Sequence, residues 1–178
     1  MSAQSTVVFI AYGTNLRLDH TPGRQALPYI VAQLKRCGVI VNNFSRLWLS
    51  RAWPDPNDPP YHNAVIQGLT NLPPQDVMAL LHRLEAEAGR VRDGPANAPR
   101  TALKNAPRTL DLDLIAYGER IIDEGGLVVP HPRAHERAFV MGPLAEIAPE
   151  WVHPVLKRTA AALYRSATVG TDAYALDA

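Results

Sequence analysis

The stretch from Arg108 to Gly118, RTLDLDLIAYG, constrains the fold more than any other part of this chain. Polar residues and leucines alternate, and an apolar run then ends at a glycine, which predicts a half-buried strand followed by a turn. Side chains two apart on a strand share a face, so Asp111 and Asp113 point the same way, roughly 6–7 Å apart along the backbone. The opposite face points into a core and carries Leu110, Leu112 and Leu114.

Two carboxylates this close repel each other unless a cation lies between them. Magnesium takes one or two carboxylates, keeps several waters and fills its remaining positions with phosphate oxygens. Four arginines precede the pair, namely Arg90, Arg92, Arg100 and Arg108. Carboxylates beside guanidiniums are typical of phosphoryl transfer, where positioning and charge neutralisation supply most of the catalysis. The pattern alone is also typical of a half-buried strand with a solvated polar face and nearby counter-charges.

Length and composition narrow the class of protein. A chain of 178 residues is expected to form one domain, residues 1–178, with a core that needs no disulfide. The formal net charge of +1 does not resemble that of a nucleic-acid binder, and the single Cys37 excludes an intramolecular disulfide. Neither a signal-peptide pattern nor a membrane-spanning run is visible. We therefore expect a cytoplasmic protein, a monomer, with no nucleic-acid or membrane partner.

The order of predicted elements indicates an α+β fold. Apolar periodicity predicts a strand over 7–12, a helix ending before Gly38, strand segments over 39–49, a strand over 61–69 and a helix from Pro73 to Gly89. With the strand after Arg108, this is the order of a ferredoxin-like βαββαβ unit, an antiparallel sheet with helices packed on it. A C-terminal extension should contain a helix broken near Pro143 and a helix within 155–164, and the last dozen residues should be frayed.

Several motifs in this order resemble the hydroxymethyldihydropterin pyrophosphokinase family of folate biosynthesis, over nearly the whole chain. They are AYGTNL at 11–16, PRTLDLD at 107–113, VPH at 129–131, RAF at 137–139 and PLAEIAP at 143–149. Several ordered motifs at matching intervals are far more specific than two aspartates alone. The resemblance implies the ferredoxin-like fold and transfer of a pyrophosphoryl group from ATP to the hydroxyl of a reduced pterin alcohol, releasing AMP.

The resemblance also assigns the phosphate side of the site. It implies two magnesium ions, bound with ATP and held by Asp111 and Asp113, and catalytic roles for Arg90 and Arg108. Bidentate guanidinium contacts suit phosphate better than lysine does. The positions that match ATP-binding residues of the family are Glu85, Arg92, Arg108, Leu114, His131 and Arg137.

The pterin side is assigned in the same way. Tyr61 and Phe139 match two stacking rings, and Asn63 matches the amide that reads the pterin edge, because one amide can both donate and accept. Ser50 and Trp53 match loop positions that meet the ring. Without the resemblance, the aromatics would equally fit a core and His131 a turn, whereas Asn63 is harder to explain because strands disfavour asparagine.

The chain departs from better-known members in three places. Asn105-Ala106 replaces a tryptophan that precedes the arginine motif, Gly126 replaces an arginine, and Pro132 replaces a tyrosine. The segment NAPRT at 97–101 also recurs at 105–109, so either Arg100 or Arg108 could reach the phosphates. We favour Arg108, because it lies three residues from Asp111 on the strand. These changes predict altered affinity or loop behaviour more than lost activity.

Two other classes of function remain open at this point. A nucleotidyltransferase on a similar sheet would use the aspartates for attack at the α-phosphorus and release pyrophosphate. A non-enzymatic ferredoxin-like module would bind RNA or a small regulator, although no strand interleaves aromatic with basic residues as such modules do.

Overall fold

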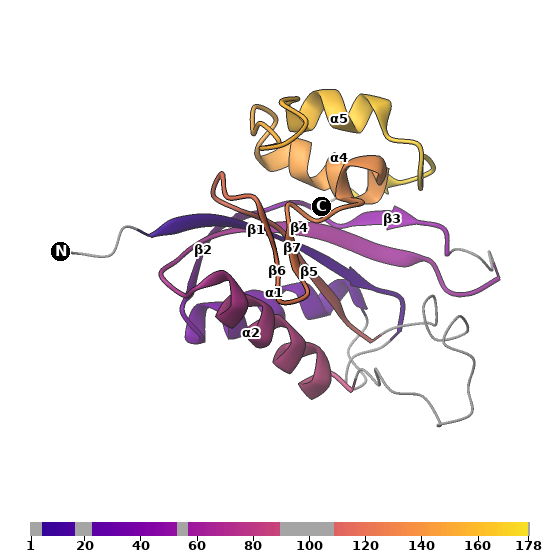
Figure 1. Cartoon of the computed structure of the whole chain (residues 1–178). Coiled ribbons are helices and arrows are strands. Elements are labelled where there is room, and N and C mark those ends of the chain that lie inside the picture. The colour runs from indigo at the N-terminus through magenta and orange to yellow at the C-terminus, as the bar shows by residue number, and fades with distance from the viewer. Residues whose placement is uncertain (1–4, 17–22, 53–56, 90–108, 178) are drawn as a thin grey trace, which may run out of the picture.

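A central antiparallel sheet lies between two pairs of helices in the computed structural model, which describes residues 5–16, 23–52, 57–89 and 109–177 (Figure 1). The sheet strands are β1 (Thr6–Thr14), β2 (Val39–Phe44), β3 (Trp48–Ser50), β4 (Tyr61–Thr70), β5 (Asp111–Tyr117) and β8 (Tyr174–Ala175). The helices are α1 (Gly23–Arg36), α2 (Pro74–Glu87), α4 (Ala138–Ile147) and α5 (Ala160–Ser166), with a 3₁₀ turn over Ala134–Glu136. A hairpin of β6 (Ile122–Glu124) and β7 (Leu127–Val129) stands apart from the sheet.

The strand order is β5-β1-β4-β3-β8, and β2 pairs with the same edge of β4 as β3 does. Helices α1 and α2 cover one face of this sheet, and α4 and α5 cover part of the other (Figure 1). This confirms the predicted α+β, ferredoxin-like βαββαβ arrangement with a C-terminal extension. Within the described ranges, no helix is both long and apolar enough to cross a membrane.

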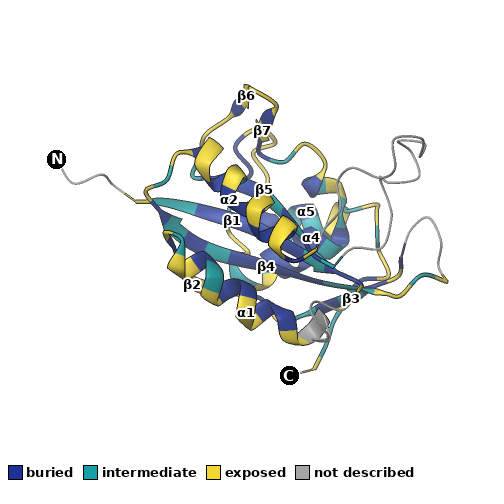
Figure 2. Ribbon diagram, turned by 90° about the horizontal axis from the view of Figure 1, so that it is seen from below, coloured by how far each residue is buried: buried dark blue, intermediate teal, exposed yellow. Residues whose placement is uncertain are grey.

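Strand alternation divides the apolar residues between the two faces. On the α1/α2 face, Val8, Ile10 and Tyr12 of β1 are at most 1 % exposed. Their neighbours Phe9 and Ala11 point to the α4/α5 face and pack in a second core. The buried positions of the strands and of the inner helix sides are dark blue in Figure 2. The strand thus contributes side chains to both cores, because successive side chains of a strand point to opposite faces of the sheet.

Local sequence explains where the first two helices end. Gly38 follows α1 with φ +93°, and Gly89 follows α2 with φ +78°, a backbone conformation that glycine adopts without a steric penalty. Pro74 occupies the first turn of α2, where its missing N–H removes no helical hydrogen bond. Pro28 lies inside α1 rather than in its first turn, and the helix continues through it.

The C-terminal extension differs from the prediction in three respects. Helix α4 runs through Pro143 to Ile147, because one proline removes only one hydrogen bond from a helix that is otherwise buried. Helix α5 begins only at Ala160, because the Thr159 side chain accepts a hydrogen bond from the Ala162 N–H and caps it there. The expected fraying of the last dozen residues is wrong for the described part, because β8 pairs with β3.

Candidate active site

The register of three neighbouring strands brings together residues that are far apart in sequence. Gly13 on β1 lies opposite Asn63 on β4 and opposite Asp111 on β5. Two residues earlier, Ala11 lies opposite Val65 and Asp113 in the same way. The middle strand therefore presents its two smallest residues beside Asn63 on one neighbour and beside Asp111 and Asp113 on the other. This combination leaves open space on the α4/α5 face.

The two aspartates share a face, as the alternation predicted. Asp111 and Asp113 are half-buried, and Leu110 and Leu112 between and beside them are buried in the α1/α2 core. Their register to Gly13 and Ala11 places both carboxylates over the small residues of β1. Both therefore line an opening on the α4/α5 face.

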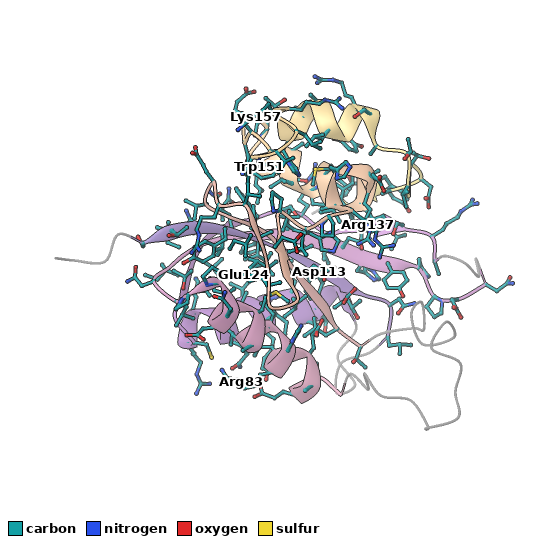
Figure 3. All side chains as sticks on the ribbon, viewed as in Figure 1. Arg83, Asp113, Glu124, Arg137, Trp151 and Lys157 are labelled. Atoms are coloured by element: carbon teal, nitrogen blue, oxygen red, sulfur yellow. The ribbon has the colours of Figure 1, made fainter. Side chains whose placement is uncertain are left out.

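A cleft on this face collects half of the predicted site residues that the structure describes, namely Asn63, Asp111, Asp113, Arg137 and Phe139. It is lined by Ala11, Tyr12, Gly13, Asn63, Asp111, Asp113, Arg137, Phe139 and Val140. In Figure 3, Arg137 lies between the sheet and α4, and Asp113 lies on β5. The Arg137 guanidinium carbon is 5.7 Å from the centre of the Phe139 ring. An aromatic ring, a guanidinium and two carboxylates thus surround one opening.

Asn63 is held in one orientation by its surroundings. Its Nδ2 donates to the Ser50 hydroxyl oxygen at 3.0 Å and to the main-chain oxygens of Tyr61 at 3.3 Å and Trp48 at 3.4 Å. A Cβ added to Gly13 would lie 3.7 Å from Asn63 Oδ1, so the amide oxygen faces the open space above β1. Ser50 is buried, and its hydroxyl oxygen helps to orient Asn63 by accepting the hydrogen bond from Nδ2. Tyr61 is half-buried and pairs with Ser50 at the start of β4, outside the cleft lining.

His131 lies beside the carboxylate pair, with its Nε2 3.9 Å from Asp113 Oδ2. Its main-chain N–H donates to the Ile115 carbonyl at 2.9 Å, which joins the loop to β5. Its Nδ1 accepts from the Arg133 N–H at 3.2 Å. Burial lowers the pKa of His131, the Asp113 carboxylate opposes this, and Arg137 and Arg133 lower it further. The neutral ring therefore carries its proton on Nε2, toward Asp113.

Two predicted ATP-binding residues lie on the other side of β5. The Leu114 side chain is 3 % exposed within the α1/α2 core, as the alternation implied, and contact of Leu114 with ATP stays a prediction. Glu85 is 1 % exposed, and its Oε1 accepts from the Leu112 N–H at 2.8 Å. This carboxylate holds the β5 backbone between the two aspartates. Contact of Glu85 with ATP stays a prediction.

Other predicted residues lie outside the described ranges. They are Trp53, Arg90, Arg92, Arg100 and Arg108, together with the duplicated segment and Asn105-Ala106. Their predicted roles therefore stay predictions. Pro132 and Gly126 are described and exposed, and Gly126 has φ +80° in the turn that joins β6 to β7.

Sequence reasoning missed the floor of the cleft. Gly13 and Ala11 shape it, and Tyr12, whose pKa burial raises, closes it from the α1/α2 side. The Thr14 hydroxyl lies 2.7 Å from the Thr109 carbonyl oxygen and so ties the end of β1 to the start of β5. The run of small and polar residues GTN at 13–15 was the available signal, but only strand register shows what it faces.

Comparisons with known proteins agree with this geometry. The model of the family described as 7,8-dihydro-6-hydroxymethylpterin-pyrophosphokinase (HPPK) matches residues 9–149. The 2-amino-4-hydroxy-6-hydroxymethyldihydropteridine pyrophosphokinase of Pseudomonas aeruginosa is 36% identical over 80% of this chain and 81% of its own length. The enzyme of that name from Synechocystis is 39% identical over 77% of this chain and 63% of its length.

Longer proteins match as well. The Pneumocystis carinii folic acid synthesis protein fol1 is 32% identical over 86% of this chain, but only 19% of that protein is covered. The crystal structure of Plasmodium falciparum HPPK-DHPS with pteroate superposes with a TM-score of 0.68, covering 93% of this chain and 45% of that one. At 11% sequence identity this likeness shows the fold alone. The chain thus spans from about a fifth to less than two thirds of several relatives that it matches.

Proposed function

Because the chain belongs to the 7,8-dihydro-6-hydroxymethylpterin-pyrophosphokinase family, we propose that it transfers the pyrophosphoryl group of ATP to the hydroxyl of hydroxymethyldihydropterin. The products are the pterin diphosphate and AMP, and the reaction is a step of folate biosynthesis. In the transfer, the pterin hydroxyl oxygen forms a bond to the β-phosphorus and loses its proton. The bond from the β-phosphorus to the α,β-bridging oxygen breaks, and AMP leaves with that oxygen.

The observation that carries this proposal is the make-up of the cleft. A fixed amide at Asn63 and an aromatic ring at Phe139 suit the edge and the flat face of a pterin. The carboxylates of Asp111 and Asp113 and the guanidinium of Arg137 suit a triphosphate with its cations. A phosphate-binding half and a pterin-binding half in one opening are what the transfer needs.

The donor set of the cleft fits magnesium. Asp111 and Asp113 offer hard oxygen ligands, and no group of three or more potential metal-ligating side chains occurs among the described residues. A site that supplies one or two carboxylates and takes its other ligands from phosphate and water is characteristic of magnesium. We propose two such ions, bound with ATP; when bound, they would neutralise the phosphate charge and align the triphosphate.

The described residues have distinct roles in this scheme. Ser50 and the carbonyls beside it orient Asn63, so that its amide oxygen is available to a pterin N–H. Phe139 offers a ring to stack on the pterin, and a second stacking ring from Tyr61 is part of the proposal by family resemblance. His131, neutral and with a proton on Nε2, and Arg137 can donate hydrogen bonds to phosphate oxygens. Catalytic roles for Arg90 and Arg108, and nucleotide contacts from Arg92, are part of the proposal by family resemblance.

We also propose a cytoplasmic monomer that takes ATP and the reduced pterin alcohol as its small-molecule partners. A single chain supplies the described lining of the cleft. Size-exclusion chromatography with light scattering, at the concentration used for the assay, tests the oligomeric state. A dimer under those conditions would contradict the monomer but leave the reaction unaffected.

Product analysis tests the function directly. Incubation with ATP, magnesium and 6-hydroxymethyl-7,8-dihydropterin should form AMP, and omission of the pterin should abolish its formation. Release of pyrophosphate instead of AMP would indicate a nucleotidyltransferase. No turnover together with tight binding of single-stranded RNA would indicate a binding module and overturn the proposal.

A further inference from the structure

The end of the chain forms a strap that joins the two sides of the pterin-binding half of the cleft. This C-terminal strap, residues 168–176, lies beyond the segment 9–149 that the family model matches. It leaves α5, passes the start of α4 and ends beside β3 (Figure 1). Its contacts fall on the residues that flank Phe139 on one side and Ser50 on the other.

The first anchor of the strap is the backbone that carries Arg137 and Phe139. The N–H groups of Thr168 and Val169 donate to the Glu136 carbonyl at 3.0 and 2.9 Å. The Ala138 N–H donates to the Val169 carbonyl at 2.8 Å, and no side chain of the described residues caps the start of α4. The strap therefore satisfies an N–H in the first turn of α4 and fixes where Phe139 leaves the backbone.

The second contact is between Gly170 and the Phe139 ring itself. Gly170 has φ +65°, and a Cβ built on it would lie 2.4 Å from Phe139 Cδ1 and 3.0 Å from Cε1. No side chain fits in that space unless the ring moves. The absence of a side chain at position 170 therefore sets the position of the Phe139 ring at the cleft.

The third anchor is β3 and the residue that follows it, Arg51. Asp172 Oδ2 accepts from the Arg51 N–H at 2.7 Å, one residue after Ser50. Beyond it, Tyr174 and Ala175 pair with Leu49 and Trp48, and the Leu176 N–H donates to the Leu47 carbonyl at 2.8 Å. Because Ser50 orients Asn63, an anchor at Arg51 also supports the amide that faces the cleft.

We propose that Gly170 and Asp172 are positioning residues that set the spacing of the pterin-binding half of the cleft, between the Phe139 ring and the Ser50–Asn63 pair. The inference rests on the proposed function. It is specific to one substrate, because Gly170 contacts Phe139 and Asp172 contacts Arg51, whereas the backbone beside Arg137 is held by Thr168 and Val169. A loss of strap contacts should therefore weaken pterin binding and leave nucleotide binding unchanged. A purely architectural role would instead lower stability and affect both substrates alike.

The Asp172 experiment separates these outcomes. Asp172→Ala removes the acceptor of the Arg51 N–H, and we expect the KM for the pterin to rise about fivefold, the effect of one lost hydrogen bond. The KM for ATP and kcat at saturating pterin should stay within about twofold of the unaltered protein. Asp172→Asn keeps an acceptor oxygen at this position and should restore the pterin KM.

The Gly170 experiment has a matched control elsewhere in the chain. Gly170→Ala should raise the pterin KM about tenfold, because the new methyl group displaces the Phe139 ring. Gly125 has a similar φ, +59°, but no atom of the described residues lies within 4 Å of a Cβ there. Gly125→Ala imposes comparable backbone strain away from the cleft and should leave both KM values unchanged, although both variants should melt at lower temperature.

Assays of the wild-type protein distinguish failure of the strap inference from failure of the proposed function. If it forms AMP in the presence of the pterin, an unchanged pterin KM in Asp172→Ala and Gly170→Ala overturns the strap inference alone. An equal rise of both KM values, or the same change in Gly125→Ala, also overturns it. If the wild-type protein neither turns over nor binds the pterin, the proposed function fails and the inference fails with it.

Discussion

The two faces of the sheet are built from the same strands and differ in what the middle strand presents. On the α1/α2 face, β1 places Ile10 and Tyr12 among large buried side chains, and the layer is closed. On the α4/α5 face, β1 presents Ala11 and Gly13, and beyond α4 the layer is open. Packing on the closed face fixes the register of the strands. Because the register is fixed, the polar groups on the open face are held at set positions. Alternation of side chains makes both possible in one strand.

The largest difference between the two faces should appear when adjacent residues of β5, which point to opposite faces, are substituted in turn. Asp111→Ala or Asp113→Ala should lower kcat by about a thousandfold or more, the scale of lost electrostatic stabilisation, with little change in melting temperature. Leu112→Ala should lower the free energy of unfolding by about 2–5 kcal/mol and leave the specific activity of the folded fraction close to normal. Steady-state AMP formation and denaturant unfolding measure the two quantities. Near-normal turnover in both aspartate variants at limiting magnesium would remove the carboxylate assignment.

Substitutions of two glycines, one on each face, should show a second and smaller difference between the faces. Gly13→Val should lower kcat/KM for the pterin about a hundredfold, because the side chain grows into the cleft between Asn63 and Asp111, while valine suits a strand. Gly68→Ala places a Cβ 2.7 Å from Val39 Cγ1 on the closed face and should cost about 1–3 kcal/mol of stability with little effect on kcat/KM. Equal kinetic effects of the two changes would contradict the division into faces.

Glu85 belongs to the closed face but acts on the open one. Glu85→Ala leaves the Leu112 N–H without its acceptor and should lower stability by about 1–3 kcal/mol. It should also lower kcat about tenfold, because the β5 backbone between the aspartates is less well fixed. Glu85→Gln keeps an acceptor and should recover most of both losses. If Glu85→Ala changed stability with kcat unaltered, Glu85 would serve the core alone.

The smallest expected effect concerns His153, in the segment that precedes α5 and outside the cleft lining. His153 Nδ1 accepts from the N–H groups of Val155 and Leu156, both at 3.2 Å, and burial first, then His135, lowers the pKa of His153. The unfolded chain therefore binds this proton at higher pH than the folded protein, so stability falls as pH drops below about 6.5. The melting temperature should decline less between pH 7.5 and 5.5 in His153→Asn. An identical decline in both proteins would exclude His153 as the cause.

Sequence patterns predicted what depends on neighbours along the chain. The alternation around Asp111 and Asp113 showed their common face, and asparagine in a strand marked Asn63 as unusual. The juxtaposition of Gly13 with Asn63 and Asp111 depends on the pairing of strands about 50 and about 100 residues apart, which no local period reveals. Leu114 is the opposite case, in which the local pattern predicted the direction of the side chain and the family match did not. Its position matched the family, but the alternation on its own strand placed its side chain in the core.

The C-terminal strap was missed for a related reason. Six of its nine residues are small or polar, a composition that favours a frayed end. Its order comes from hydrogen bonds to Glu136, Leu47 and Arg51, none of which is a neighbour in sequence. Composition predicts whether a segment is ordered on its own. It does not predict hydrogen bonds to distant parts of the fold, and these bonds order the strap.

The most direct test of the account is a crystal structure with a non-hydrolysable ATP analogue, magnesium and the pterin alcohol bound. The account predicts the pterin ring against Phe139 with its edge on Asn63, and the triphosphate with its cations at Asp111 and Asp113, all on the α4/α5 face of the sheet. Ligands bound elsewhere, or a triphosphate that does not approach the two aspartates, would contradict it.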